Sequence, residues 1–173
     1  MKKVLFSLLA CSILLAGCLG GEDKFAREVV KEQEAVKLAK EVVRGGYELI
    51  TVAELKDLQD KNTDMVIVDT MPYDASYVKG HVPGAKQFLF PIKLMTSWDT
   101  NETADKTQAE YAALLGPDKD KLIVVYCGFV KCGRSDNGAY WATKMGYTNV
   151  KRLPGGIYAW RGASYPVAEG ADG

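Results

Sequence analysis

The sequence contains few of the residues from which metal sites and nucleic-acid interfaces are built. It has one histidine among 173 residues, and its four cysteines are not grouped as paired ligands, so a tetrahedral zinc site is not expected. Acidic and basic residues balance at 22 each, which leaves no excess of positive charge for a nucleic acid or a polybasic membrane patch. We therefore expect no metal, no organic cofactor and no nucleic-acid partner.

Internal repeats and low-complexity stretches are also missing, as is an apolar run long enough to span a bilayer comfortably. The longest apolar run covers residues 4–15, follows Lys2 and Lys3, and is interrupted at only three positions. This pattern is typical of a signal-peptide core. The remaining length and the 47% hydrophobic content suit one globular domain with short attachments.

The signal-like run ends in Leu15-Ala16-Gly17-Cys18, which resembles the bacterial lipobox. The resemblance implies a lipoprotein signal peptide over residues 1–17, cleavage before Cys18, and a lipidated tether over residues 18–24. Several acyl chains on Cys18 would form a stable anchor, whereas one chain is marginal. The protein is then expected outside the cytoplasm, anchored to a bacterial membrane on the periplasmic side or at the cell surface. The alternative is an ordinary secretory signal that is cut nearby.

Residues 25–46 have the pattern of an amphipathic helix. Phe25, Val29, Val36 and Val43 lie four or seven positions apart among many charges, and Gly45-Gly46 ends the pattern. Such a helix either packs on the following domain or acts as a stalk, and the sequence leaves both open.

After residue 46, strand and helix patterns alternate. Strands are predicted at 49–51, 65–68, 85–88, 122–126 and 150–153, and helices at 52–60, 105–115, 135–145 and 155–160. The alternation predicts an α/β domain over residues 47–168, with a parallel sheet covered by helices on both faces. Ligands bind beyond the carboxyl ends of such strands. Cys127 directly follows the strongest strand pattern and is therefore a candidate for chemistry.

The segment after that strand has the composition of an anion-binding loop. A loop that curls from a strand into a helix N-terminus presents successive backbone amides and a helix dipole to an anion, and Lys131 and Arg134 add positive charge. These features favour the thiolate of Cys127, which is the nucleophilic form. The alternative is that Cys127 is an inert residue ending a core strand. The candidate substrate-binding residues are Gly128, Phe129, Val130, Lys131, Cys132, Gly133 and Arg134.

Three stretches resemble motifs of the rhodanese homology domain and occur in the same order as in that family. The resemblance covers about residues 48–167. The stretches are VD at 68–69 with YVKGHVPGA at 77–85, YCGFVKCGRS at 126–135, and LPGGIYAW at 153–160 with YPV at 165–167. The resemblance implies a five-stranded parallel sheet and a sulfurtransferase in which Cys127 cycles between thiolate and persulfide. Its partners would be a small anionic donor, such as thiosulfate or polysulfide, and a thiol, a cyanide-like acceptor or a protein thiol.

Two positions depart from the family pattern. Met71 stands where many members have an arginine, so any support which that arginine gives the active loop is missing or supplied by another residue. Arg134 follows Cys127 by seven positions, which is longer than the spacings common in the sulfurtransferases and the related dual-specificity phosphatases. The longer loop predicts a larger or differently shaped pocket, so a preference for thiosulfate is not implied.

Cys132 and the chemistry of the loop are also compatible with functions other than sulfur transfer. Cys132 lies five residues after Cys127, which makes it either a resolving cysteine that attacks a persulfide or forms a disulfide with Cys127, or a residue that never comes close enough to react. A carrier or thiol redox module using both cysteines is the alternative function. A cysteine-dependent phosphatase or arsenate reductase is disfavoured by the loop spacing and by the lack of an acidic residue in the loop.

Overall fold

The computed structural model describes residues 23–171, so the predicted signal peptide and Cys18 lie outside the described residues. Within this range five strands form one parallel sheet in the order β1-β5-β4-β2-β3. The strands are β1 (Glu48–Leu49), β2 (Met65–Asp69), β3 (Ala85–Gln87), β4 (Leu122–Tyr126) and β5 (Val150–Leu153). The helices are α1 (Lys24–Gly45), α2 (Val52–Asp60), α3 (Gln108–Leu115), α4 (Arg134–Lys144) and α5 (Gly156–Gly162), with short 3-10 turns at Tyr77–Lys79 and Thr100–Thr103.

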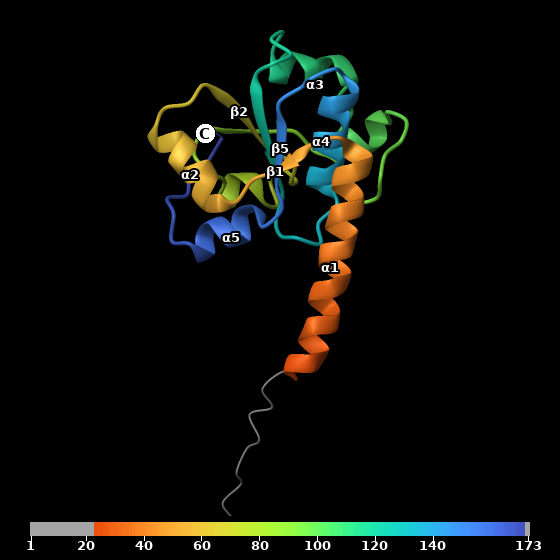
Figure 1. Cartoon of the computed structure of the whole chain (residues 1–173). Coiled ribbons are helices and arrows are strands. Elements are labelled where there is room, and N and C mark those ends of the chain that lie inside the picture. The colour runs from red at the N-terminus through yellow and green to blue at the C-terminus, as the bar shows by residue number, and fades with distance from the viewer. Residues whose placement is uncertain (1–22, 172–173) are drawn as a thin grey trace, which may run out of the picture.

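Side chains of the central strand β4 alternate between two hydrophobic cores. Ile123 and Val125 pack with Tyr111 of α3 and Trp141 of α4 on one face, whereas Val124 and Tyr126 pack with residues of α2 and α5 on the other. Successive side chains of a strand point to opposite faces, so both faces of the sheet are covered, with α2 and α5 on one side (Figure 1). The predicted five-stranded α/β domain is confirmed.

The helix predicted at 105–115 starts later than expected. Ala104 and Asp105 have φ angles of 54° and 61°, and the left-handed region is incompatible with a helix start. Thr107 instead caps the helix, because its side chain accepts from the Glu110 amide while the Glu110 carboxylate accepts from the Thr107 amide. This capping box is visible in the sequence as Thr107 followed three positions later by Glu110, and it places the start at Gln108.

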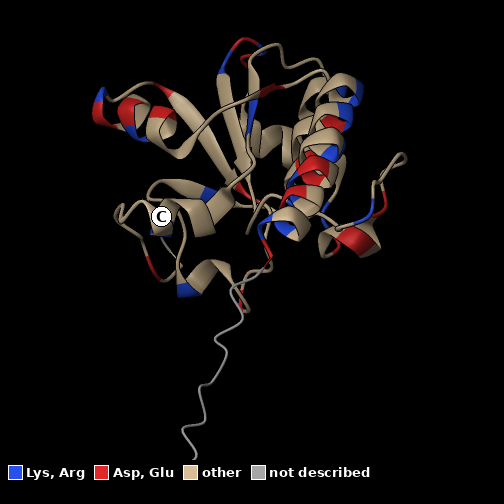
Figure 2. Cartoon of the chain, turned by 60° about the horizontal axis from the view of Figure 1, so that its bottom comes forward, with Lys and Arg blue, Asp and Glu red and all other residues tan. Residues whose placement is uncertain are grey.

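The helix α1 packs on the domain with its second half. It begins after Asp23, whose side chain accepts from the Phe25 amide, and it ends at Gly46 in the left-handed conformation. Its first half is exposed and extends beyond the domain (Figure 1), while Glu41 and Gly45 in the second half are buried. Acidic and basic residues alternate along the helix (Figure 2). Among the described residues no helix is long and apolar enough to cross a membrane.

Candidate active site

Cys127 lies where the sequence predicted chemistry, one residue beyond the end of the central strand β4. The loop of residues 127–133 leads from this strand into α4. Neighbouring strands β5 and β2 flank β4, so the loop sits at the carboxyl edge of the sheet, where ligands bind in open parallel sheets. The Cys127 side chain is completely buried.

Three oxygen atoms lie near the Cys127 sulfur. The Ser135 Oγ lies 3.2 Å from it, the carbonyl oxygen of Cys132 lies at 3.4 Å and that of Phe129 at 3.9 Å. The Ser135 amide also donates toward this sulfur. Burial nevertheless raises the pKa of the Cys127 thiol well above its ordinary value, and the neighbouring Cys132 raises it further, while Ser135 acts in the opposite direction.

The pKa of Cys132 shifts in the opposite direction to that of Cys127. A hydrogen bond from the Cys127 thiol lowers the pKa of Cys132 to about 6, and the amides of Gly128 and Arg134 and the charge of Arg134 add to this effect against the cost of burial. Two of the loop amides predicted to hold an anion, those of Gly128 and Arg134, therefore donate to the Cys132 sulfur in this structure. The two thiols are in contact and free of a disulfide.

The two loop cations are already engaged with other groups. Lys131 forms an ion pair with Glu34 of α1 at 3.0 Å, and the Arg134 guanidinium donates to the carbonyl oxygen of Phe90. Lys131 thus ties the loop to α1, and Arg134 acts on Cys132 through its amide and its charge.

Phe129 and Val130 lie at the outer side of the loop. Phe129 is 43% exposed and its ring lies 5.5 Å from that of Tyr158 on α5, and Val130 is half-buried. An apolar wall therefore stands beside the loop.

Two glycines allow the backbone to close around the cysteine. Gly156 has a φ of +57°, and a Cβ there would lie 2.1 Å from the carbonyl oxygen of Cys127. At Gly133 a Cβ would lie 2.1 Å from the carbonyl oxygen of Ile92. Gly156 of the terminal signature therefore serves close packing against the active loop.

Sequence reasoning missed Arg152 on β5. Its side chain is fully buried, its Nε donates to Ser135 Oγ at 2.9 Å, and its Nη2 donates to the carbonyl oxygen of Cys132 at 3.0 Å. Met71, which replaces the family's arginine, lies against Gly128. The only sequence signal was an arginine inside a strand expected to be buried on both faces. The guanidinium that supports the loop thus comes from β5.

Asp69 and His81 make contacts that support the fold. Asp69 accepts from the Met71 amide at 2.8 Å. His81 is buried, stacks on Tyr77 with ring centroids 3.9 Å apart, and its Nδ1 lies 2.9 Å from the Tyr77 carbonyl oxygen. The histidine ring therefore bonds to the backbone of its own turn.

Comparisons with known proteins agree with this architecture. The chain is 34% identical over 133 residues to the HTH-type transcriptional regulator Rv0324 of Mycobacterium tuberculosis, covering 77% of this chain and 50% of that protein. It therefore spans about half the length of the curated relative it matches.

Two solved structures share the fold. A thiosulfate sulfurtransferase from Pseudomonas aeruginosa superposes with a TM-score of 0.59 at 22% identity, covering 80% of this chain and 23% of that one. The polysulfide-sulfur transferase homodimer from Wolinella succinogenes gives a TM-score of 0.54 at 17% identity, covering 80% and 91%. The family model described as the rhodanese-like domain matches residues 51–163, and the chain belongs to this family.

Proposed function

We propose that the protein is a sulfurtransferase that carries a sulfane sulfur on Cys127. The observation that carries the proposal is the position of Cys127 at the carboxyl end of β4, beneath a loop in which the Gly128 and Arg134 amides already donate to a sulfur, that of Cys132. The same amides suit the outer, negatively charged sulfur of a Cys127 persulfide.

The reaction runs in two steps. The Cys127 thiolate attacks the sulfane sulfur of thiosulfate, a new S–S bond forms, and sulfite leaves with the electron pair of the broken S–S bond. A polysulfide reacts in the same way and leaves as a chain one sulfur shorter. An acceptor thiolate or cyanide then attacks the outer sulfur of the persulfide, and the Cys127 thiolate is released.

The Phe129–Tyr158 wall favours an apolar or extended donor and acceptor. Phe129 and Tyr158 are 43% and 63% exposed beside the loop, which suits a polysulfide chain or the surface around a protein thiol more than a small, strongly hydrated anion.

Mass spectrometry of the reduced protein after exposure to thiosulfate or polysulfide tests this function. We expect a gain of one sulfur that cyanide removes and that Cys127→Ser abolishes. Cys132→Ser is the matched control, because it changes the other loop thiol and should still accept sulfur. A Cys127→Ser protein that takes up sulfur as well as the unaltered chain does would overturn the proposal.

A thiol redox module is the second candidate, and the hydrogen bond between the two buried thiols favours it. In this function a disulfide of another molecule accepts two electrons and two protons from Cys127 and Cys132, which become joined. A linked peptide of residues 127 and 132 after mild oxidation, without sulfur uptake from either donor, is the result expected. Free thiols after the same oxidation would rule it out. Turnover of an aryl phosphate would instead indicate phosphatase chemistry.

We propose further that Cys18 carries the lipid that anchors the protein outside the cytoplasm. The support is the sequence Leu15-Ala16-Gly17-Cys18 after an apolar run. Cells fed a labelled fatty acid should label the protein, and Cys18→Ala should abolish the label. Equal labelling of both proteins would refute the anchor.

A further inference from the structure

The buried Arg152 side chain has hydrogen-bond partners in α1, α4 and the active loop. The side chain is 0% exposed, and besides Ser135 and the Cys132 carbonyl its Nη1 donates to Glu41 Oε2 at 2.6 Å and to the Tyr47 hydroxyl at 3.2 Å. A buried guanidinium is costly unless its charge and its donors are matched. Here all three nitrogens have acceptors, and two of those acceptors belong to the residues around Cys127.

The chemistry of arginine fixes the direction of the next hydrogen bond. Arginine only donates, so Ser135 Oγ accepts from Arg152 Nε. The hydroxyl proton of Ser135 is then free to point at the Cys127 sulfur 3.2 Å away. A hydroxyl that donates to sulfur stabilises a thiolate or a persulfide anion relative to the protonated form.

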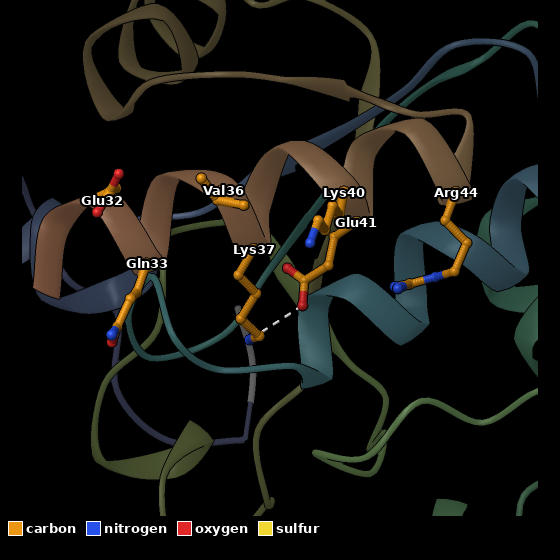
Figure 3. A pocket seen from close by; sticks show the side chains of 7 residues that line it. All are labelled: Glu32, Gln33, Val36, Lys37, Lys40, Glu41 and Arg44. Carbon is orange, nitrogen blue, oxygen red and sulfur yellow. Dashed lines mark ion pairs between the residues drawn. The ribbon is translucent and has the colours of Figure 1, made fainter. Parts of the chain in front are cut away.

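Glu41 of α1 supplies the matching negative charge. Burial raises the pKa of Glu41, but the hydrogen bond and charge of Arg152, with Lys37, outweigh burial and hold that pKa below its ordinary value. Lys37 contacts the second carboxylate oxygen at 3.1 Å and also donates to the carbonyl oxygen of Lys131 in the loop at 3.0 Å. Figure 3 shows Lys37, Glu41 and Arg44 pointing from α1 toward α4.

The helix that provides Glu41 lies outside the residues matched by the family model, which begin at residue 51. A chain of hydrogen bonds runs from Glu41 of α1 through Arg152 to Ser135 and to the Cys132 carbonyl oxygen. The second half of this helix, which the sequence left open as a stalk or a packed element, packs on the domain and contacts the residue that supports the active loop.

We propose that Arg152, held by Glu41 of α1, is a positioning residue that orients the Ser135 hydroxyl toward Cys127 and thereby favours the anionic form of Cys127. The inference rests on the proposed function, in which Cys127 is the sulfur-carrying nucleophile. In the family, an arginine at the position of Met71 would support the loop. In this chain we assign that support to β5 and α1.

The test is the pH dependence of Cys127 alkylation by iodoacetamide, read at the Cys127 peptide in the full chain. Arg134 and Asp69 are charged groups close to the cysteine pair, and Cys132 itself titrates. The alkylation of Cys132 is therefore followed separately. Arg152→Gln and Glu41→Gln should move the Cys127 midpoint upward by about one pH unit, which lowers the rate at neutral pH about tenfold. Arg152→Lys keeps the charge without the guanidinium fork and should give an intermediate midpoint.

A double-variant cycle tests whether the effect passes through Ser135. Ser135→Ala should shift the midpoint as Arg152→Gln does, and the two changes together should add little to either alone. Two matched controls remove similar charges elsewhere: Arg161→Gln on α5, where the guanidinium donates to the Lys79 carbonyl oxygen, and Glu28→Gln on the exposed half of α1. Both should keep the unaltered midpoint.

The outcomes separate this inference from the proposed function. Variants of Arg152 and Glu41 that lower the melting temperature but keep the pH profile of Cys127 would reduce Arg152 to a structural residue and overturn the inference. If Arg152→Gln fails to fold, Glu41→Gln and Ser135→Ala decide in the same way. An unaltered chain that takes up no sulfur, while the profiles shift as expected, would leave Arg152 as a positioning residue and refute the sulfurtransferase.

Discussion

The amide of Ile157 donates to the carbonyl oxygen of Cys127 at 2.9 Å. The next amide, of Tyr158, donates to the carbonyl oxygen of Gly128 at 3.0 Å. The first turn of α5 therefore holds the start of the active loop through the backbone. These contacts bring the terminal signature against the cysteine loop, although the two lie far apart in the sequence.

Gly156→Ala should weaken this attachment. Its φ of +57° disfavours a side chain, and the added Cβ would lie 2.1 Å from the Cys127 carbonyl oxygen. Strain in the left-handed region alone costs roughly 1–2 kcal/mol, and the clash requires the loop or α5 to move as well. We expect a lower free energy of unfolding in urea and a loss of sulfur uptake by Cys127.

Gly146→Ala is the matched control for that substitution. Gly146 has a φ of +88°, but nothing lies within 4 Å of an added Cβ. This variant should lose stability through backbone strain alone and keep sulfur uptake per folded molecule. Equal stability loss and equal uptake in the two variants would show that the contact between Gly156 and Cys127 has no special importance.

The sequence predicted the fold because each local pattern agreed with the global one. The apolar run at β4, the glycines that end α1 and the strand–helix alternation all indicate the same α/β domain, and the structure confirms it. The late start of α3 could have been read from Thr107 and Glu110, whose spacing is that of a capping box. The order of the strands could not be read, because the side chains of one strand do not specify its neighbours.

The candidate site was predicted only along its own loop. Cys127 is recognisable because the strand, the glycines and the following helix are contiguous in sequence. Arg152 and Glu41 are 111 positions apart, and each looks like an ordinary charged residue in its own segment. Their pairing arises from the packing of α1 on α4 beside β5, which no local pattern specifies.

Asp69 should make stability depend on pH. Burial raises the pKa of Asp69 to about 6, although hydrogen bonds from the Met71 amide and the Tyr126 hydroxyl act in the opposite direction. An acid whose pKa is higher in the folded than in the unfolded chain stabilises the fold when protonated. Its contribution is present below about pH 4 and is lost as the pH rises to about 6.

Urea unfolding of the unaltered chain and of Asp69→Asn between pH 4 and pH 7 measures this contribution. As the pH rises, the free energy of unfolding should fall by on the order of 2–3 kcal/mol more in the unaltered chain than in Asp69→Asn. The reason is that the pKa of Asp69 is about two units higher in the folded than in the unfolded chain. Asn keeps an acceptor for the Met71 amide and carries no titrating proton. Parallel curves for the two proteins would mean that Asp69 has the same pKa in both states.

Cys132 should be alkylated at lower pH than Cys127. The hydrogen bond from the Cys127 thiol is the largest of the effects that lower the pKa of Cys132 to about 6. Cys127→Ala removes this donor, so the midpoint of Cys132 alkylation by iodoacetamide, followed by peptide mass spectrometry, should rise toward the ordinary cysteine range of about 8–9.

Cys127→Ser separates the hydrogen bond from the thiol itself. A serine hydroxyl can still donate to the Cys132 sulfur, so its midpoint should lie between those of the unaltered chain and Cys127→Ala. A Cys132 midpoint that is the same in all three proteins would show that the loop amides alone hold the charge. The two cysteines would then titrate independently, and the contact between them would no longer favour a redox function for the pair.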